Sequence, residues 1–276
     1  MIVVTGATGN VGRALVRTLA AADERVTAVA RRSAPDLPGI RHVSADLAEP
    51  ASLKPAMDGA DALFLLTPAD LLWSGDGGTV VRDVLDVARA GGVRRVVLLS
   101  SQGVGTLRHP SALEDATKQS GLEWTVLRPG GFDTNAFLWA ETIRTRRTAA
   151  APFGDVALPS VDPADIAEVV AVALRERGHA GRTYVLTGPA PISPRQQAEA
   201  IGAALGESVR FVEHSPDQAR AQLSRFMPEP VVLATLGILG SPSAAERQVS
   251  PDVARILGRP AGTFAEWARR NTAAFS

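Results

Sequence analysis

The amino terminus joins a short apolar run to three evenly spaced glycines. Residues 1–4 are apolar, Gly6, Gly9 and Gly12 follow, and residues 11–22 carry apolar side chains at helical spacing. This order predicts a buried strand, a tight turn and a helix, which together open a sheet of parallel strands. The start of such a helix attracts anions through its free N–H groups and its dipole. The spacing GxxGxxG departs from the common GxGxxG fingerprint, so other residues must help decide what the turn binds.

Strand-like and helix-like segments alternate at least five times before residue 132. Such alternation requires right-handed crossovers and predicts an α/β fold with a Rossmann-like, doubly wound parallel sheet. The pattern then changes, and we expect residues 1–150 to form the sheet domain and residues 151–276 a smaller, partly integrated α+β lobe. The expected strands are 1–4, 25–30, 40–43, 60–66, 95–99, 123–127, 183–186 and 209–212, and the expected helices are 11–22, 52–57, 79–90, 112–119, 163–177 and 193–205.

Composition removes several classes of function. The 29 Lys and Arg residues balance 29 Asp and Glu residues, so bulk charge favours no nucleic-acid partner. The absence of cysteine excludes disulfides, thiolate nucleophiles and thiolate metal ligands, and we expect no metal. No apolar run approaches the roughly 20 residues of a membrane-spanning helix. A cytoplasmic protein without a membrane partner is therefore expected.

The turn after the first strand has the features of a phosphate-binding loop. Gly6 permits the sharp turn, Gly9 lets phosphates approach the backbone, and Gly12 lets the helix pack closely on the strand. Thr8 and Asn10 add side-chain donors. The alternative is a glycine turn that holds no ligand. We expect pyrophosphate contacts from Gly6, Thr8, Gly9, Asn10, Val11 and Gly12.

Ligands of doubly wound sheets bind outside the carboxyl ends of the strands, and the tip of the second strand commonly selects the cofactor. Arg31 and Arg32 stand there without an acid, which favours the 2′-phosphate of NADP(H) over NAD(H), because guanidinium groups pair well with phosphate. A solvated basic turn is the alternative. Asp46, with Leu47, suits an adenine contact, although a helix-capping Asp is an equal alternative. Residues expected to line the path to the nicotinamide are Thr67, Pro68, Ser100 and Ser101.

Taken together, these motifs resemble the NmrA-like group of atypical short-chain dehydrogenases/reductases, which includes type 2 NAD(P)H:quinone oxidoreductases. The resemblance rests on GATGNVG at 6–12, ADL at 45–47, LLTP at 65–68, SSQG at 100–103 and SGLEWTVLRPGGFDTN at 120–135, and it continues through 161–174, 181–189 and 258–275. It implies an NAD(P)-binding domain, the cofactor contacts just named, and a roof over the nicotinamide from Pro129, Gly130 and Phe132. It does not settle activity, because the group mixes reductases with sensors.

The chain lacks the usual catalytic pair of short-chain reductases. That pair, Tyr-x-x-x-Lys, moves a proton at the substrate carbonyl while the cofactor supplies hydride. The single tyrosine, Tyr184, lies in a late predicted strand, and the helix register places the pair at Thr106 and Pro110. Neither residue can replace the pair, so the catalytic residues stay unknown and a standard carbonyl reductase is not expected.

Other side chains are candidates for the substrate side. Gln102 stands where the superfamily often has a serine, His109 neighbours the missing lysine, and Asn135 follows Phe132. For His109 and Asn135, an exposed loop residue and a turn residue are the alternatives. The apolar stretch formed by Phe132, Phe137, Leu138 and Trp139 either walls a pocket or packs within the lobe. Asp133 and His179 are expected at the surface.

Quinone reduction fits this set of residues best, because a quinone accepts hydride readily and the resulting oxyanion takes a proton from solvent. The leading hypothesis is an NADPH-dependent reductase of a quinone or polycyclic aromatic substrate. The alternatives are a non-catalytic NAD(P) sensor and a tailoring enzyme of an aromatic polyketide pathway. Oligomeric state stays open, with a homodimer as one alternative.

Overall fold

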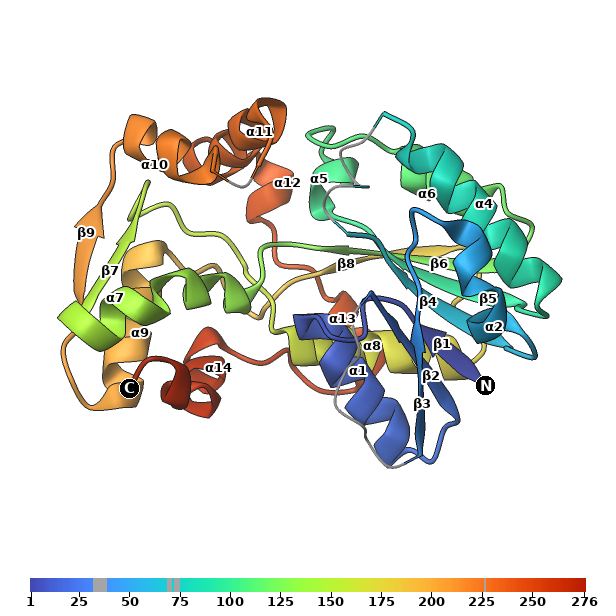
Figure 1. Cartoon of the computed structure of the whole chain (residues 1–276). Coiled ribbons are helices and arrows are strands. Elements are labelled where there is room, and N and C mark those ends of the chain that lie inside the picture. Colours follow the sequence, from blue (N-terminus) through green and yellow to red (C-terminus); the bar gives the residue numbers. More distant parts are fainter. Residues whose placement is uncertain (32–38, 69–70, 72–74, 226) are drawn as a thin grey trace. The chain divides into compact units, whose positions relative to one another are not determined.

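The computed structural model describes residues 1–31, 39–68, 71, 75–225 and 227–276. These residues divide into two compact units, each assembled from several segments (Figure 1). The first comprises 1–104, 110–129 and 163–185, and the second comprises 105–109, 130–162 and 186–276. The chain therefore passes between the units more than once, and the division into functional domains at residue 150 stays a prediction.

The first unit is built on a seven-stranded sheet in the order β3-β2-β1-β4-β5-β6-β8. Every pairing from β3 through β6 is parallel, as the alternating pattern predicts. The order reverses between β1 and β4, which is the point where doubly wound sheets bind ligands. The strands are β1 Ile2–Val4, β2 Val26–Ala30, β3 Ile40–Ser44, β4 Ala62–Leu66, β5 Arg95–Leu99, β6 Glu123–Pro129 and β8 Arg182–Leu186.

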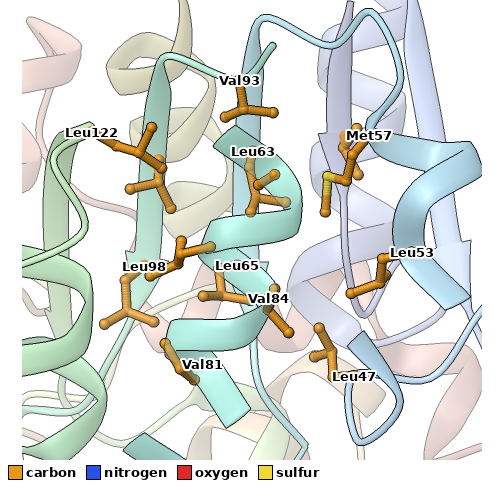
Figure 2. Close-up of a cluster of buried hydrophobic side chains, with 14 of the residues drawn as sticks. Leu47, Leu53, Met57, Leu63, Leu65, Val81, Val84, Val93, Leu98 and Leu122 are labelled. Carbon is orange, nitrogen blue, oxygen red and sulfur yellow. The ribbon is translucent and has the colours of Figure 1, made fainter. Parts of the chain in front are cut away.

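Helices cover both faces of this sheet (Figure 1). Alternate residues such as Leu63 and Leu65 turn toward α4, where Val81 and Val84 complete a buried cluster (Figure 2). On the other face, α1 and α8 pack against each other and the sheet. The helical segments are α1 Asn10–Ala21, η1 Pro50–Leu53, α2 Lys54–Met57, α4 Gly77–Ala90, α5 Gln102–Gly105, α6 Ala112–Lys118 and α8 Pro163–Arg175.

The second unit has its own aromatic core around Trp267. Its ring centroid lies 5.1 Å from those of both Phe137 and Phe264, and 6.1 Å from that of Phe275. A two-stranded parallel sheet pairs β7 with β9. The elements are η2 Asp133–Trp139, α7 Ala140–Arg146, β7 Thr148–Ala151, α9 Pro194–Leu205, β9 Arg210–Glu213, α10 Pro216–Leu223, α11 Glu229–Gly240, α12 Ala244–Arg247, α13 Asp252–Leu257, α14 Phe264–Arg270 and η3 Thr272–Ala274.

The secondary-structure elements between residues 133 and 151 were not predicted from the sequence. The 3-10 helix η2, helix α7 and strand β7 are short, and TAAA in β7 carries no β-branched or aromatic alternation, so local patterning gives little signal. The predicted helix at 193–205 begins with a capping box, in which Ser193 Oγ accepts from the Gln196 N–H and the Gln196 side chain accepts from the Ser193 N–H. Among the described residues, no helix is long and apolar enough to cross a membrane.

Candidate functional site

The glycine turn between β1 and α1 is shaped by two close approaches. Gly6 has φ +62°, which is left-handed backbone, and an added Cβ would lie 2.6 Å from Leu66 Cδ2. A Cβ on Gly12 would lie 2.1 Å from the Gly6 carbonyl oxygen, so only glycine lets α1 start this close to the turn. At Gly9 the nearest atom would be the same oxygen at 3.3 Å. Residue 9 is therefore the least crowded of the three glycine positions in the turn.

The first turn of α1 has no side-chain cap and no acidic residue. The first N–H groups of a helix lack partners within the helix, and an anion can satisfy them. Thr8 and Asn10 are exposed at this end, whereas the Val11 side chain is buried in the core. Any contact from Val11 to a ligand would therefore come from its backbone N–H.

Thr5 fixes the carboxyl ends of β1 and β4 side by side at the switch point. Its Oγ1 accepts from the Leu66 N–H at 2.8 Å and is within hydrogen-bond distance of the carbonyl oxygens of Phe64 and Leu66. The next strand continues this edge, because Leu66 is in register with Leu99. The predicted residues Thr67, Pro68, Ser100 and Ser101 thus follow neighbouring strands, and all four are half-buried.

The tips of β2 and β3 carry the predicted specificity residues. Arg31 is exposed directly after β2, whereas Arg32 lies outside the described residues. Asp46 is half-buried, and its Oδ1 accepts from the Ala48 N–H at 3.0 Å. This hydrogen bond closes a local turn and uses one carboxylate oxygen, but it caps no helix, because the N-cap of η1 is Glu49. The Leu47 side chain belongs to the buried cluster of Figure 2.

Glu114 on α6 is a buried carboxylate at the carboxyl ends of β5 and β6, with its side chain 1% exposed. Arg128 binds it in a bidentate manner at 2.8 and 2.7 Å, while Lys118 and Ser100 donate at 2.8 and 2.7 Å. Burial alone would raise the pKa of Glu114, but these hydrogen bonds outweigh it and lower the pKa to about 2. This network of hydrogen bonds around Glu114 was not predicted from the sequence.

The segment that replaces the catalytic pair is tied to a second buried carboxylate, Glu246, whose side chain is 2% exposed. Thr106 Oγ1 donates to Glu246 Oε1 at 2.9 Å, and Arg108 Nε donates to the same oxygen at 3.3 Å. Burial of Glu246 opposes ionisation, yet these donors and Ser243 lower its pKa overall. The burial of Glu246 was also not predicted from the sequence. The spacing of Ser243-Ala-Ala-Glu246 is nevertheless that of a capping box, which marks the start of a helix.

His109 is half-buried beside this cluster. Burial lowers its pKa, while the charge of Glu246 acts in the opposite direction. The imidazole is therefore neutral at physiological pH, since its ordinary pKa of about 6.5 already lies below that range. Gln102 is half-buried in α5.

The residues after β6 belong to the second unit. Pro129 is buried at the end of β6, the Gly130 N–H donates to the Leu186 carbonyl at 2.9 Å, and Phe132 is half-buried. Asn135 is exposed. The cofactor candidates up to Pro129 lie in the first unit, so the approach of Phe132, Asn135 and His109 to them stays a prediction.

Three expectations, for Asp133, for the apolar stretch around Phe137 and for His179, are corrected or refined by the structure. Asp133 was expected at the surface, but it is 1% exposed and accepts from Ser160 Oγ at 2.5 Å. The 3-10 turn that starts there directs its side chain inward, a bend that sequence patterning did not show. Phe137 packs in the aromatic core, whereas Leu138 is 65% exposed. His179 is half-buried and shares a 3.0 Å hydrogen bond with the Tyr184 hydroxyl.

Comparison with known proteins indicates that the chain binds a dinucleotide cofactor. The NAD(P)H-binding family matches residues 6–177. The (4-alkanoyl-5-oxo-2,5-dihydrofuran-3-yl)methyl phosphate reductase of Streptomyces griseus is 35% identical over 301 positions, covering 100% of this chain and 99% of the relative. The chain belongs to the NAD(P)H-binding family. The NAD(P)H azoreductase of Xenophilus azovorans is 32% identical to this chain, covering 100% of this chain and 99% of that protein.

The fold of this NAD(P)H-binding family member matches that of a solved oxidoreductase. The NADPH-dependent quinone oxidoreductase QOR2 of Escherichia coli, solved with NADPH, superposes with a TM-score of 0.78 at 24% identity, covering 98% of this chain and 99% of that chain. The Rossmann-like fold is confirmed, and so is the predicted resemblance to NAD(P)H-dependent reductases that include a quinone oxidoreductase. The chain is an NAD(P)H-dependent oxidoreductase. Within the described ranges, no three His, Cys, Asp or Glu side chains gather to hold a metal ion.

Proposed function

We propose that this protein is an NADPH-dependent reductase of a quinone or of another electron-poor aromatic acceptor. Hydride passes from NADPH to the acceptor, and one proton from solvent completes the product, giving NADP⁺ and a hydroquinone. The protein holds the nicotinamide against a flat substrate, and positioning of this kind accelerates a transfer that needs little further assistance. The cofactor contacts are those of the glycine turn and of the strand ends around Arg31, Asp46, Thr67 and Ser100.

The observation that carries the proposal is the hydrogen bond from Thr106 to Glu246. Thr106 stands where the register places the catalytic tyrosine, and its hydroxyl donates to the buried Glu246. A hydroxyl held by a carboxylate is a poor proton donor to a carbonyl substrate. Quinone reduction tolerates this loss, because the negative charge that develops on oxygen is delocalised and is protonated by water.

The names of the relatives support an acceptor of this kind. One relative reduces an alkanoyl furanone phosphate, a second is an azoreductase, and the structural neighbour is a quinone oxidoreductase. Furanone, azo and quinone groups are all conjugated and electron-poor. The cofactor preference is supported by Arg31 at the tip of β2, because arginine pairs well with the 2′-phosphate of NADPH.

The test is a comparison of acceptors at fixed NADPH. Purified protein is mixed with NADPH and with benzoquinone, naphthoquinone, an azo dye or a simple ketone, and loss of reduced nicotinamide absorbance is followed. We expect oxidation with quinones and none with the ketone. Binding of NADPH without oxidation by any conjugated acceptor would instead indicate a sensor. Reduction of the ketone alone would contradict the argument from Thr106.

A further inference from the structure

Glu114 and Ser100 form a hydrogen bond at the carboxyl end of β5, inside the first unit. The two atoms, Ser100 Oγ and Glu114 Oε1, are 2.7 Å apart. The same Oε1 accepts from Arg128 Nε, while Oε2 accepts from Arg128 and Lys118. Each carboxylate oxygen therefore receives two donors. A buried carboxylate with this many donors is fully satisfied.

The direction of the Ser100 hydrogen bond follows from the charge of Glu114. With two cations in contact, the carboxyl group is ionised, and an ionised carboxylate only accepts hydrogen bonds. Ser100 must therefore be the donor. Its single hydroxyl proton is committed to Glu114, and what remains on Oγ is acceptor capacity.

The location of Ser100 gives this acceptor a use. Its N–H donates to the Leu127 carbonyl at 2.8 Å, which holds the residue level with the end of β6. The side chain is half-buried, at the edge where β4 and β5 end in register. Ligands of doubly wound sheets lie outside this edge. A hydrogen-bond acceptor at this edge therefore lies where a bound dinucleotide is expected.

We propose that Glu114 is a positioning residue that fixes Ser100 Oγ as a hydrogen-bond acceptor for an N–H or O–H group of the bound dinucleotide. The proposal rests on the cofactor half of the proposed function and is independent of the acceptor. Two groups of NADP⁺ supply such donors near the reacting ring, the nicotinamide amide and the adjoining ribose hydroxyls. Ser100 Oγ accepts the hydrogen bond from one of these groups, and Glu114 determines which way the Ser100 hydroxyl points.

The first experiment measures dissociation constants of NADP⁺ by titration calorimetry, without turnover. We expect Ser100→Ala to weaken NADP⁺ binding about five- to tenfold, the effect of one lost hydrogen bond. The 3-acetylpyridine analogue of NADP⁺ lacks the amide N–H groups. If Ser100→Ala leaves binding of this analogue unchanged, the amide is the donor, and if both ligands weaken equally, a ribose hydroxyl is. Unchanged NADP⁺ binding by the folded Ser100→Ala variant would overturn the proposal.

The second experiment tests whether Glu114 acts through Ser100. We expect Glu114→Gln to weaken NADP⁺ binding about as much as Ser100→Ala, and the double variant to bind no more weakly than Ser100→Ala alone. Non-additivity of this kind marks residues that act as one unit. Equal further weakening of NADP⁺ binding by Glu114→Gln in the Ser100→Ala background would show that Glu114 acts by another route, and would overturn the positioning role.

A matched control separates positioning from loss of stability. Arg95 pairs with Glu123 across the same two strands at their opposite ends, at 3.3 Å, and also donates to the Leu174 carbonyl. We expect Arg95→Met to lower the thermal midpoint while leaving the NADP⁺ dissociation constant unchanged. If Arg95→Met weakens NADP⁺ binding as much as Glu114→Gln, the effect comes from destabilised strands and the proposal fails. A protein that reduces no quinone but passes these binding tests contradicts only the proposed function.

Discussion

The carbonyl oxygen of Gly6 occupies the space that a side chain on Gly12 would need, since an added Cβ would lie 2.1 Å away. Both partners in this contact are backbone, so neither can move without shifting β1 or α1. We expect Gly12→Ala to lower the free energy of unfolding by about 1–3 kcal/mol, as overpacking of a close contact does. Denaturant unfolding of the apo protein measures this directly.

Gly9→Ala is expected to weaken cofactor binding while changing the stability of the apo protein little. The backbone at Gly9 is extended, with φ −78°, and its added Cβ would meet only the Gly6 oxygen at 3.3 Å. We expect the apo thermal midpoint to stay within about 2 °C of wild type, equivalent to about 1 kcal/mol or less. NADPH binding should fall about tenfold or more, because the new methyl group stands where phosphate approaches the helix. If this variant binds NADPH with the affinity of the wild type, the phosphates do not bind at the glycine turn and the prediction is wrong.

The cofactor preference depends on Arg31 at the tip of β2. Arg31→Asp replaces a guanidinium by a carboxylate, and we expect the NADPH dissociation constant to rise roughly 10- to 100-fold while that of NADH changes by less than about threefold. Arg17→Asp, an exposed site on α1, makes the same change in net charge and serves as the control. Equal losses for the two cofactors would remove the assignment to the 2′-phosphate.

Thr106→Val tests whether catalysis uses the threonine hydroxyl. General acid catalysis contributes roughly 100-fold or more, so a kcat for quinone that stays within about threefold of wild type excludes this role. The thermal midpoint should nevertheless fall by about 3–8 °C, because Glu246 loses a donor and a hydrogen bond to a charged group is worth about 1.5–3 kcal/mol. A large loss of kcat with an unchanged midpoint would reverse this interpretation.

Stability in acid should depend on Glu114. Its pKa is about 2 in the folded protein and near 4.5 when unfolded, so it stabilises the fold at neutral pH. This contribution, roughly 3 kcal/mol by linkage, is lost as pH falls from about 5 toward 2. We expect Glu114→Gln to be less stable than wild type at pH 7 and to lose less stability across that pH range. Parallel stability curves for the two proteins would contradict the linkage.

The fold of the first unit could be predicted from the sequence because its signals are local. Runs such as Ala62–Leu66 are buried on both faces of the sheet and are therefore apolar throughout. The glycine turn indicates where the first connection from strand to helix begins. The switch point follows from these elements and from general rules of topology.

The two buried carboxylates could not be predicted in the same way. Nothing in the local sequence distinguishes Glu114 from an exposed helical glutamate, because Arg128 lies 14 residues away. The partners of Glu246 are more distant still, with Thr106 separated by 140 residues. Asp133 was misplaced for a similar reason, since its partner Ser160 comes from a different segment. Polar groups that pair across long stretches of sequence produce no periodic pattern from which the pairing could be predicted.

Helices α9, α10, α12 and α14 each begin with a complete capping box, whereas α1 begins with none. If the dinucleotide binds at the glycine turn, as proposed, its phosphates take the place of the side-chain cap that α1 lacks. A ligand that binds only the folded state stabilises it by an amount that grows with the logarithm of its concentration. On this proposal, the concentration of cofactor contributes to the stability of the protein against unfolding and proteolysis, in addition to its rate of turnover.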